Sequence, residues 1–295
     1  MRSSGGVLTR LLHAGDRPVV VHAWQRRSGA VAIRAQLPGA ADEPWRADGG
    51  GRAALEEAVA RMRFAMAVDD DLRPFYAELK RDPFLGPAIR RRPWLRAKRR
   101  PVAWEALAWA ITEQLIESSR AAAIQKRMIR RWGRGCEWRG RGAERRPLVD
   151  VPSAEAIAAR APAELAACDL SPARSLAMVR CAREVASGRA DPADRAADQR
   201  FVRIGEIGPW TLQCLGLFGR GDFDSLPAGD LAYVKLVGVV AGLGRRATVA
   251  EVEEFYAPYA PYRGLAGVFS LSHYAWAQTA ARGLPMAPDL HAEAA

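Results

Sequence analysis

The stretch best suited to chemistry covers residues 204–230 and reads IGEIGPWTLQCLGLFGRGDFDSLPAGD. Gly205 and Gly208 bracket a tight reversal, and Pro209 suits the first position of the helix after it. Backbone N–H groups that are free at such a helix start attract a phosphate. Asp230 lies 22 residues beyond Gly208 and could act on the sugar attached to that phosphate. The stretch therefore predicts a backbone grip on phosphate paired with a carboxylate.

Asp230 also has a structural interpretation. It follows a turn and precedes a helical stretch, and aspartate is a common N-cap residue. The two roles are compatible, because the positive end of a helix keeps a carboxylate ionised. Asp222 and Asp224 compete for the chemical role, but they lie in a polar loop without this placement.

Composition favours a polyanionic partner. The 295 residues carry a net charge of +11, with 40 Arg and only 4 Lys. The planar guanidinium donates two hydrogen bonds to one phosphate, although genome base composition could also produce the arginine bias. The four cysteines and four histidines are scattered, which indicates neither disulfides nor a metal site. No membrane-length apolar run or signal peptide is found, so we expect a cytoplasmic, nucleoid-associated protein.

Helices dominate the pattern after a short β-rich start. Residues 18–24 and 31–37 are β-branched runs that predict a hairpin, and apolar residues from Leu55 to Met66 recur at helical spacing. Residues 88–101 form a basic linker that could follow a phosphate backbone or simply be a solvated connection. Residues 133–147 are rich in Arg and Gly, and we expect a disordered surface loop there.

One long helix is expected from Val102 to Gly133, with a single apolar stripe made of Leu107, Ala110, Ile111 and Leu115. Later helices are expected after Ser153, from Pro172 to Ser187, and over residues 231–243 and 264–282. The expected fold is mainly α. A small α+β domain over residues 1–88 precedes an all-helical core of two subdomains over residues 89–295, and the hairpin covers residues 204–210.

Four motifs occur in an order that resembles the helix-hairpin-helix DNA glycosylase superfamily, and within it the 3-methyladenine DNA glycosylase II branch. They are AWAITEQL around Gln114, DLSPARSLAMVRCA, IGEIGPWT and LPAGDLAYVK. Together they span about residues 100–280. Each motif is weak alone, whereas their conjunction is specific.

The resemblance implies an enzyme of base excision repair that acts on alkylated, 3-methyladenine-like bases flipped out of double-stranded DNA. Asp230 matches the catalytic aspartate, which stabilises positive charge on the deoxyribose during hydrolysis. Trp210 stands where bifunctional relatives carry a catalytic lysine, so we expect no strand cleavage. No cysteine follows Cys214, which excludes the iron-sulfur cluster of some relatives. A monomer without organic cofactor is expected, although hairpin carbonyls in this superfamily can hold a monovalent cation.

The resemblance also assigns the remaining site residues. The set comprises Trp210, Cys214 and Trp276 in the base pocket; Gly205, Glu206, Ile207, Gly208 and Thr211 in the DNA-binding hairpin; Leu170, Ser171 and Pro172 in a wedge loop that fills the hole left by the flipped nucleotide; and Gln114 as a further family match. Leu170 and Trp276 could instead be ordinary core residues. Two departures stand out: Glu206 replaces a hairpin glycine, and Cys214 replaces a pocket tyrosine.

Three other functions fit parts of the pattern. The enzyme could accept deaminated or oxidised bases instead of alkylated ones. The chain could be a non-catalytic helix-hairpin-helix protein that binds damaged DNA. It could also be a helical scaffold whose basic surface meets RNA or acidic proteins.

Overall fold

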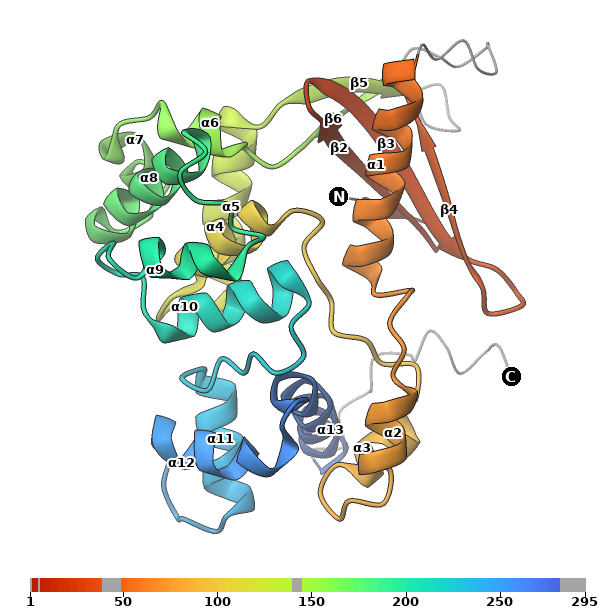
Figure 1. Cartoon of the computed structure of the whole chain (residues 1–295), viewed down its shortest axis with the longest axis vertical. Coiled ribbons are helices and arrows are strands. Elements are labelled where there is room, and N and C mark those ends of the chain that lie inside the picture. Colours follow the sequence, from red (N-terminus) through yellow and green to blue (C-terminus); the bar gives the residue numbers. More distant parts are fainter. Residues whose placement is uncertain (1, 5, 39–48, 140–144, 282–295) are drawn as a thin grey trace.

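A computed structural model describes the backbone of residues 2–4, 6–38, 49–139 and 145–281, and the side chains of residues 6–38, 51–138 and 147–275. Helices make up most of it, and one antiparallel sheet lies near the N-terminus (Figure 1). This confirms the expected mainly α class with a small α+β start. Within the described residues, no helix is long and apolar enough to span a bilayer.

The N-terminal sheet has the strand order β1-β2-β3-β4. Its strands are β1 (Arg2–Ser4), β2 (Val7–Ala14), β3 (Arg17–Gln25) and β4 (Val31–Gln36). The predicted hairpin is confirmed as β3 and β4, which pair from Val20↔Gln36 to Gln25↔Val31. Helix α1 (Gly49–Met66) covers one face of the sheet, where side chains such as Val19, Val21, Ala58 and Met62 form a buried cluster (Figure 1).

A second, two-stranded sheet occupies the segment expected to be a disordered loop, and that expectation was wrong. Strands β5 (Gly135–Arg139) and β6 (Arg145–Val149) pair antiparallel. Leu148 is buried with Leu11 and Val20 of the first sheet, and Trp138 packs against them. Residues 140–144, between the two strands, lie outside the described part of the chain.

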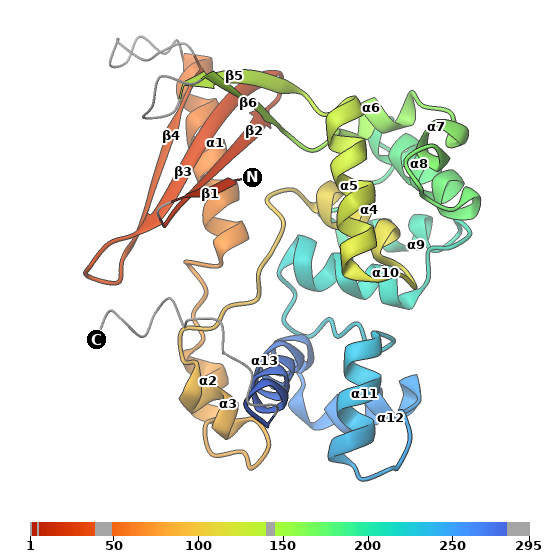
Figure 2. The same cartoon turned by 180° about the vertical axis from the view of Figure 1, so that it is seen from behind.

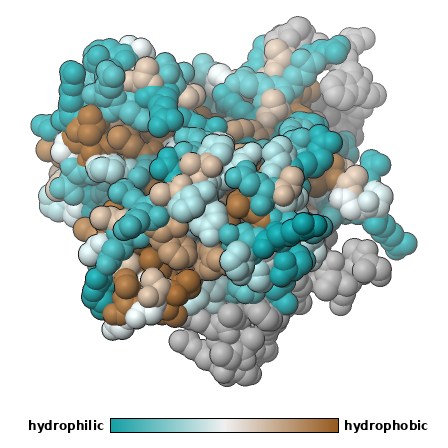
Figure 3. All heavy atoms as spheres, turned by 60° about the horizontal axis from the view of Figure 1, so that its bottom comes forward, coloured by the Kyte–Doolittle hydropathy of each residue, from teal (hydrophilic) through white to brown (hydrophobic). Residues whose placement is uncertain are grey.

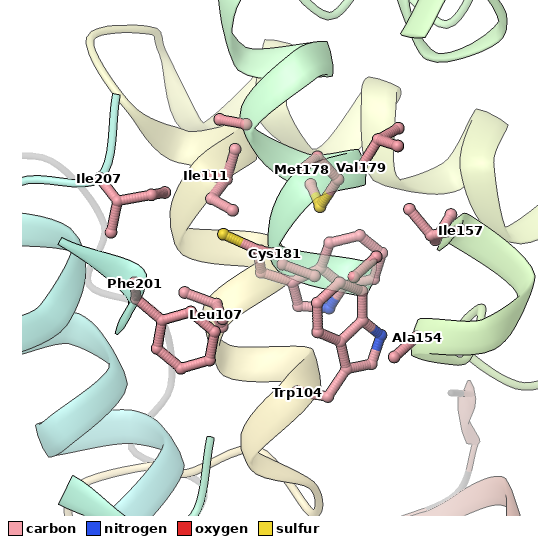
Figure 4. Close-up of a cluster of buried hydrophobic side chains, with 14 of the residues drawn as sticks. Trp104, Leu107, Ile111, Ala154, Ile157, Met178, Val179, Cys181, Phe201 and Ile207 are labelled. Atoms are coloured by element: carbon pink, nitrogen blue, oxygen red, sulfur yellow. The ribbon is translucent and has the colours of Figure 1, made fainter. Parts of the chain in front are cut away.

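The first helical layer surrounds α4 (Ala103–Glu113). The layer also contains α5 (Ser118–Trp132), α6 (Ala154–Ala158), α7 (Pro162–Ala166), α8 (Pro172–Ala186), η1 (Arg195–Ala197), α9 (Asp198–Phe201), α10 (Pro209–Cys214) and the π-helical turn η2 (Leu215–Arg220). Ser153 caps α6 as expected, by accepting a hydrogen bond from Ala156 N. Figure 4 shows the cluster inside this layer, where Leu107 and Ile111 meet Met178 and Phe201.

The expected single helix from Val102 to Gly133 is instead two helices. Helix α4 ends at Glu113, α5 begins at Ser118, and Leu115 lies between them with φ 51°. Leu115 is not part of the apolar stripe, because its side chain is fully exposed. Ser118 and Ser119, residues common at helix starts, were the sequence signal for this break.

The second helical layer brings together residues 73–91 and residues 231–281. It contains α2 (Arg73–Leu79), α3 (Gly86–Arg91), α11 (Leu231–Val240), α12 (Val249–Tyr256), η3 (Ala257–Tyr259) and α13 (Arg263–Ala281). Figures 1 and 2 show α13 between α3 and α11. Phe75 and Ile89 share a hydrophobic cluster with Tyr256 and Phe269, so packing crosses the expected domain boundary at residue 88. On its outside this layer mixes hydrophobic patches with hydrophilic surface (Figure 3).

Candidate active site

The hairpin is held by its own apolar residue. Ile207 is 4% exposed and belongs to the cluster around α4, whereas Gly205 and Glu206 face solvent. Gly208 precedes the first turn of α10 in an extended conformation, and Pro209 is the first helical residue. The chain reversal thus presents its outer rim to solvent, whereas Ile207, which was assigned to the DNA-binding hairpin, is buried on its inner side.

Glu206 occupies a conformation that suits glycine. Its φ is 71°, in the left-handed region, which costs a residue with a β-carbon about 1–2 kcal/mol. This explains physically why a glycine is favoured there. Among the described residues Glu206 forms no ion pair, and its side chain is exposed.

Gln114 ties the end of α4 to the hairpin. Its Nε2 donates to the Glu206 carbonyl oxygen at 2.7 Å and to Thr211 Oγ1 at 2.9 Å. Thr211 is only 2% exposed, so the hydroxyl would lack a partner without this contact. Gln114 therefore satisfies the buried Thr211 hydroxyl, and it brings the end of α4 directly beside the hairpin.

Asp230 caps α11. Its Oδ1 accepts a hydrogen bond from Ala232 N at 2.8 Å, and Oδ2 makes no hydrogen bond to the described residues. The side chain is half-exposed. One carboxylate oxygen is thus held by the helix start while the other is available, so the N-cap and chemical roles coexist.

The two competing aspartates are engaged in holding the loop before Asp230. Asp224 receives hydrogen bonds from Arg263 Nε at 2.9 Å and from Arg263 Nη2, and this contact lowers the pKa of the Asp224 carboxyl. Asp222 accepts from Ser225 Oγ at 2.8 Å and from Asp224 N at 2.9 Å. Both oxygens of each of these carboxylates accept hydrogen bonds, whereas Oδ2 of Asp230 accepts none from the described residues.

Trp210 and Cys214 both lie next to Asp230. A β-carbon at Gly229 would sit 3.7 Å from Trp210 Cδ1, so the indole lies against the backbone just before Asp230. Cys214 is buried one helical turn after Trp210. Burial, then the charges of Glu113 and Asp230, raise the pKa of the Cys214 thiol well above its usual value. The thiol therefore stays neutral between two carboxylates.

Glu113 is a site residue that the sequence reading missed. It is the last residue of α4, and its side chain is 39% exposed. Gln125 Nε2 donates to Glu113 Oε1 at 3.0 Å, and Arg100 Nη2 lies 3.8 Å from the same oxygen. The available signal was its position directly before Gln114.

The residues assigned to the wedge loop differ in their exposure to solvent. Leu170 is 2% exposed and lies in the core, which favours its alternative role as a buried contact between helices. Ser171 caps α8 through Arg174 N, and Pro172 is exposed at the first helical position. The most exposed large apolar side chain among the described residues is instead Leu115, and the sequence reading placed it on a buried stripe.

Two further features complete the picture. Trp276 lies in α13, but its side chain is outside the described part of the chain. A cavity of about 400 Å³ borders the opposite side of α10 and is lined by residues such as Arg195, Leu212, Gln213 and Arg220 rather than by Asp230. Within the described residues no group of three or more His, Cys, Asp or Glu side chains could hold a metal ion.

Comparison with solved structures decides the fold. The chain is similar to a 3-methyladenine DNA glycosylase from Archaeoglobus fulgidus, with a TM-score of 0.75 and 21% identity over 92% of this chain and 87% of that one. The chain has the helix-hairpin-helix DNA glycosylase fold. This confirms the resemblance seen in its motifs.

Other proteins with the glycosylase fold differ in specificity. An 8-oxoguanine glycosylase/lyase from Clostridium acetobutylicum, solved with DNA, matches with a TM-score of 0.67 and 14% identity over 91% of this chain and 88% of that one. By sequence, a DNA-3-methyladenine glycosylase of Bacillus subtilis strain 168 is 26% identical over 217 residues, which is 72% of this chain and 70% of the relative. No protein-family model matches the chain.

Proposed function

We propose that this protein is a DNA glycosylase of base excision repair that hydrolyses the N-glycosidic bond of alkylated purines in double-stranded DNA. The observation that carries the proposal is Asp230, whose Oδ1 is fixed at the start of α11 while Oδ2 is available, with Trp210 packed against the preceding residue, Gly229. Two of the three relatives named above, one found by sequence and one by structure, are 3-methyladenine glycosylases.

The chemistry follows from the charge that develops during bond cleavage. The bond between C1′ and the base nitrogen breaks with its electron pair moving to the base, which leaves positive charge on the sugar. The Asp230 carboxylate stabilises this charge. Water adds to C1′ and loses a proton, so that a free base and an abasic sugar remain. No organic cofactor is needed for this step.

The negative potential of the site also favours alkylated purines over oxidised bases as substrates. A purine alkylated at a ring nitrogen carries a positive charge in DNA, whereas an oxidised or deaminated base is neutral at pH 7. Glu113 and Asp230 place negative potential around the neutral Cys214 thiol, and Trp210 offers an aromatic face to a cationic ring. The site is therefore electrostatically suited to a cationic base.

Leu115 is proposed as the side chain that enters the duplex. It is apolar and fully exposed, and it directly follows Gln114, which contacts the hairpin. An apolar side chain inserted into the base stack occupies the space of a flipped nucleotide. This assigns to Leu115 the role that the sequence suggested for the loop at residues 170–172.

Hydrolysis without strand cleavage is also part of the proposal. Trp210 has no amine to form a Schiff base at the position where bifunctional relatives carry lysine. We further propose that the protein acts as a monomer on damaged duplex DNA.

The test uses duplex DNA treated with a methylating agent. The wild-type protein is expected to release free 3-methyladenine and to leave abasic sites that break only after alkali. Asp230→Asn should lower the single-turnover release rate by about 10²–10³-fold, the usual effect of removing one electrostatic catalyst. Asp16→Asn, which changes a fully exposed carboxylate on the N-terminal sheet, should have no effect.

Other outcomes would separate the alternatives. Unchanged release by Asp230→Asn would reject the mechanism, whereas tight binding of damaged DNA without release by the wild type would indicate a binding protein. Strand breaks before alkali, with borohydride trapping of a protein-DNA adduct, would contradict the absence of lyase activity.

A further inference from the structure

Backbone strain is concentrated in three neighbouring loops. Among the described residues, four other than glycine have positive φ: Ala67, Leu115, Asp169 and Glu206, with φ values of 53°, 51°, 74° and 71°. Three of them lie in the loop after α4, the loop before α8 and the hairpin. Such conformations cost about 1–3 kcal/mol each and persist only where surrounding contacts impose them. The contacts around these residues therefore show what holds the loops in their strained conformations.

Arg174 is the side chain that joins these loops. Its Nη1 donates to the Gln114 carbonyl oxygen at 2.7 Å, and its Nε donates to Ser171 Oγ at 3.0 Å. Gln114 in turn donates from its side chain to the Glu206 carbonyl oxygen. A continuous hydrogen-bonded path thus runs from the start of α8 through the end of α4 to the hairpin.

The bond to Gln114 lies at the point where α4 ends. In a continuing helix, the Gln114 carbonyl oxygen would accept a hydrogen bond from residue 118. Arg174 supplies a charged donor in its place, which is a known way to satisfy the last carbonyls of a helix. The chain can then turn at Leu115 and direct this side chain into solvent instead of onto the apolar stripe of α4.

A second contact restrains the same pair of loops less strongly. Arg120, near the start of α5, donates to both carboxylate oxygens of Asp169 at 3.1 and 2.9 Å and lowers the pKa of that carboxyl. The side chains of this pair are 59% and 44% exposed, so solvent screens it. The half-buried Arg174 is therefore the stronger restraint on Leu115.

We propose that Arg174 is a positioning residue that holds Leu115 in its left-handed conformation, ready to enter damaged DNA, and couples this loop to the hairpin. The inference rests on the proposed function, in which Leu115 occupies the space of a flipped nucleotide. Arg174 acts through Gln114 and Leu115 and is not itself a catalytic residue.

The test compares affinities for two duplexes, one undamaged and one containing a tetrahydrofuran abasic analogue. Removing the apolar side chain in Leu115→Ala should lower the preference for the abasic duplex. Arg174→Gln should lower the same preference by about tenfold, the effect of losing a charged hydrogen bond. Arg180→Gln, which removes an exposed charge from the same helix, should weaken both complexes alike and leave the preference unchanged.

Coupling and conformation provide two further readouts. If Arg174 acts through Leu115, the double variant should lose no more preference than Leu115→Ala alone. Arg174→Lys, which can still donate one hydrogen bond, should retain part of the preference for the abasic duplex that Arg174→Gln loses. Fluorescence of 2-aminopurine beside the abasic analogue should rise on binding of wild-type protein, because Leu115 disturbs stacking, and should rise less with Arg174→Gln.

The inference and the proposed function can fail separately. Additive losses in the double variant, or an unchanged preference in Arg174→Gln with wild-type melting behaviour, would overturn the positioning role alone. A wild-type protein that binds both duplexes equally would overturn the proposed function together with it. If Arg174→Gln melts early, Arg174→Lys is compared with Leu115→Ala instead, because Lys retains the charge. A preference of Arg174→Lys for the abasic duplex that lies between those of the wild type and Leu115→Ala would support the positioning role, and a wild-type preference would contradict it.

Discussion

Glu206 is expected to affect the hairpin in two ways, through its backbone strain and through its charge. Its φ of 71° is strained, and its carboxylate is exposed at the rim where a phosphate would lie. We expect Glu206→Gly to raise the free energy of unfolding by about 1 kcal/mol, because glycine adopts this conformation without a steric cost. Chemical denaturation measures this change, and fluorescence anisotropy should show tighter duplex binding.

Glu206→Gln separates the two effects. It removes the negative charge but keeps the strained conformation, so duplex affinity should rise while stability stays the same. A lower stability of Glu206→Gly than of the wild type would contradict the strain argument.

Glu113 is expected to determine which bases the site prefers. Its charge acts on the same thiol as that of Asp230, and a cationic base would feel both. Glu113→Gln should reduce kcat/KM for 3-methyladenine relative to neutral hypoxanthine by about tenfold, roughly 1.4 kcal/mol of lost electrostatic attraction at partly exposed distances. Competition between the two lesions in one reaction measures the ratio directly.

Glu117→Gln serves as the control for this change. It removes a carboxylate from the same loop at an exposed position, and the ratio should not move. An equal loss for both lesions in Glu113→Gln would assign Glu113 to the fold of the site instead of to its specificity.

At the scale of elements, α11 makes Asp230 structural as well as chemical. The hydrogen bond from Ala232 N to Oδ1 is an N-cap contact, and Asn can replace Asp in it. Asp230→Ala should therefore lower the free energy of unfolding by about 1 kcal/mol, whereas Asp230→Asn should be nearly neutral. Both variants should lose base excision. Thermal unfolding of the two proteins side by side checks the difference, and equal stabilities would show that the cap contributes nothing.

Elements with a clear period or cap were predictable from the sequence, and elements fixed by distant contacts were not. The β3–β4 hairpin, the Ser153 cap and α8 were predicted because their signals are local. The break after Glu113 was missed because Leu115 continues the apolar spacing of α4, and the Arg174 donor that meets the Gln114 carbonyl oxygen lies 60 residues away along the chain. Strands β5 and β6 were missed because the residues they pack against, Leu11 and Val20, belong to the first sheet and are distant in sequence.

The candidate site follows the same rule. Asp230 and the hairpin were predictable because a turn, a cap and a helix start are contiguous in sequence. Which apolar side chain is exposed was not predictable, since nothing in the sequence next to Leu170 or Leu115 indicates their exposures of 2% and 102%.

Across the whole molecule, the basic linker is less available to DNA than its charge suggests. Arg99 is buried in a paired contact with Asp70, and its guanidinium lies 4.8 Å from the Phe64 ring centroid and 5.4 Å from that of Phe223. The backbone N–H of Arg100 donates to the Phe218 carbonyl oxygen at 2.7 Å. This segment therefore joins α1 to the loop before Asp230. Much of the positive charge thus stabilises the fold.

The remaining exposed arginines should make DNA binding strongly dependent on salt. Contacts to about five phosphates would give a slope of roughly −4.5 for log K against log salt concentration. Arg203 is exposed directly before the hairpin, so Arg203→Gln should reduce the magnitude of the slope by about 0.9, the share of one phosphate. Arg52→Gln removes an equally exposed charge from α1 and should leave the slope unchanged. Equal changes in both variants would mean that overall charge, and not a defined DNA-facing surface around the hairpin, governs binding.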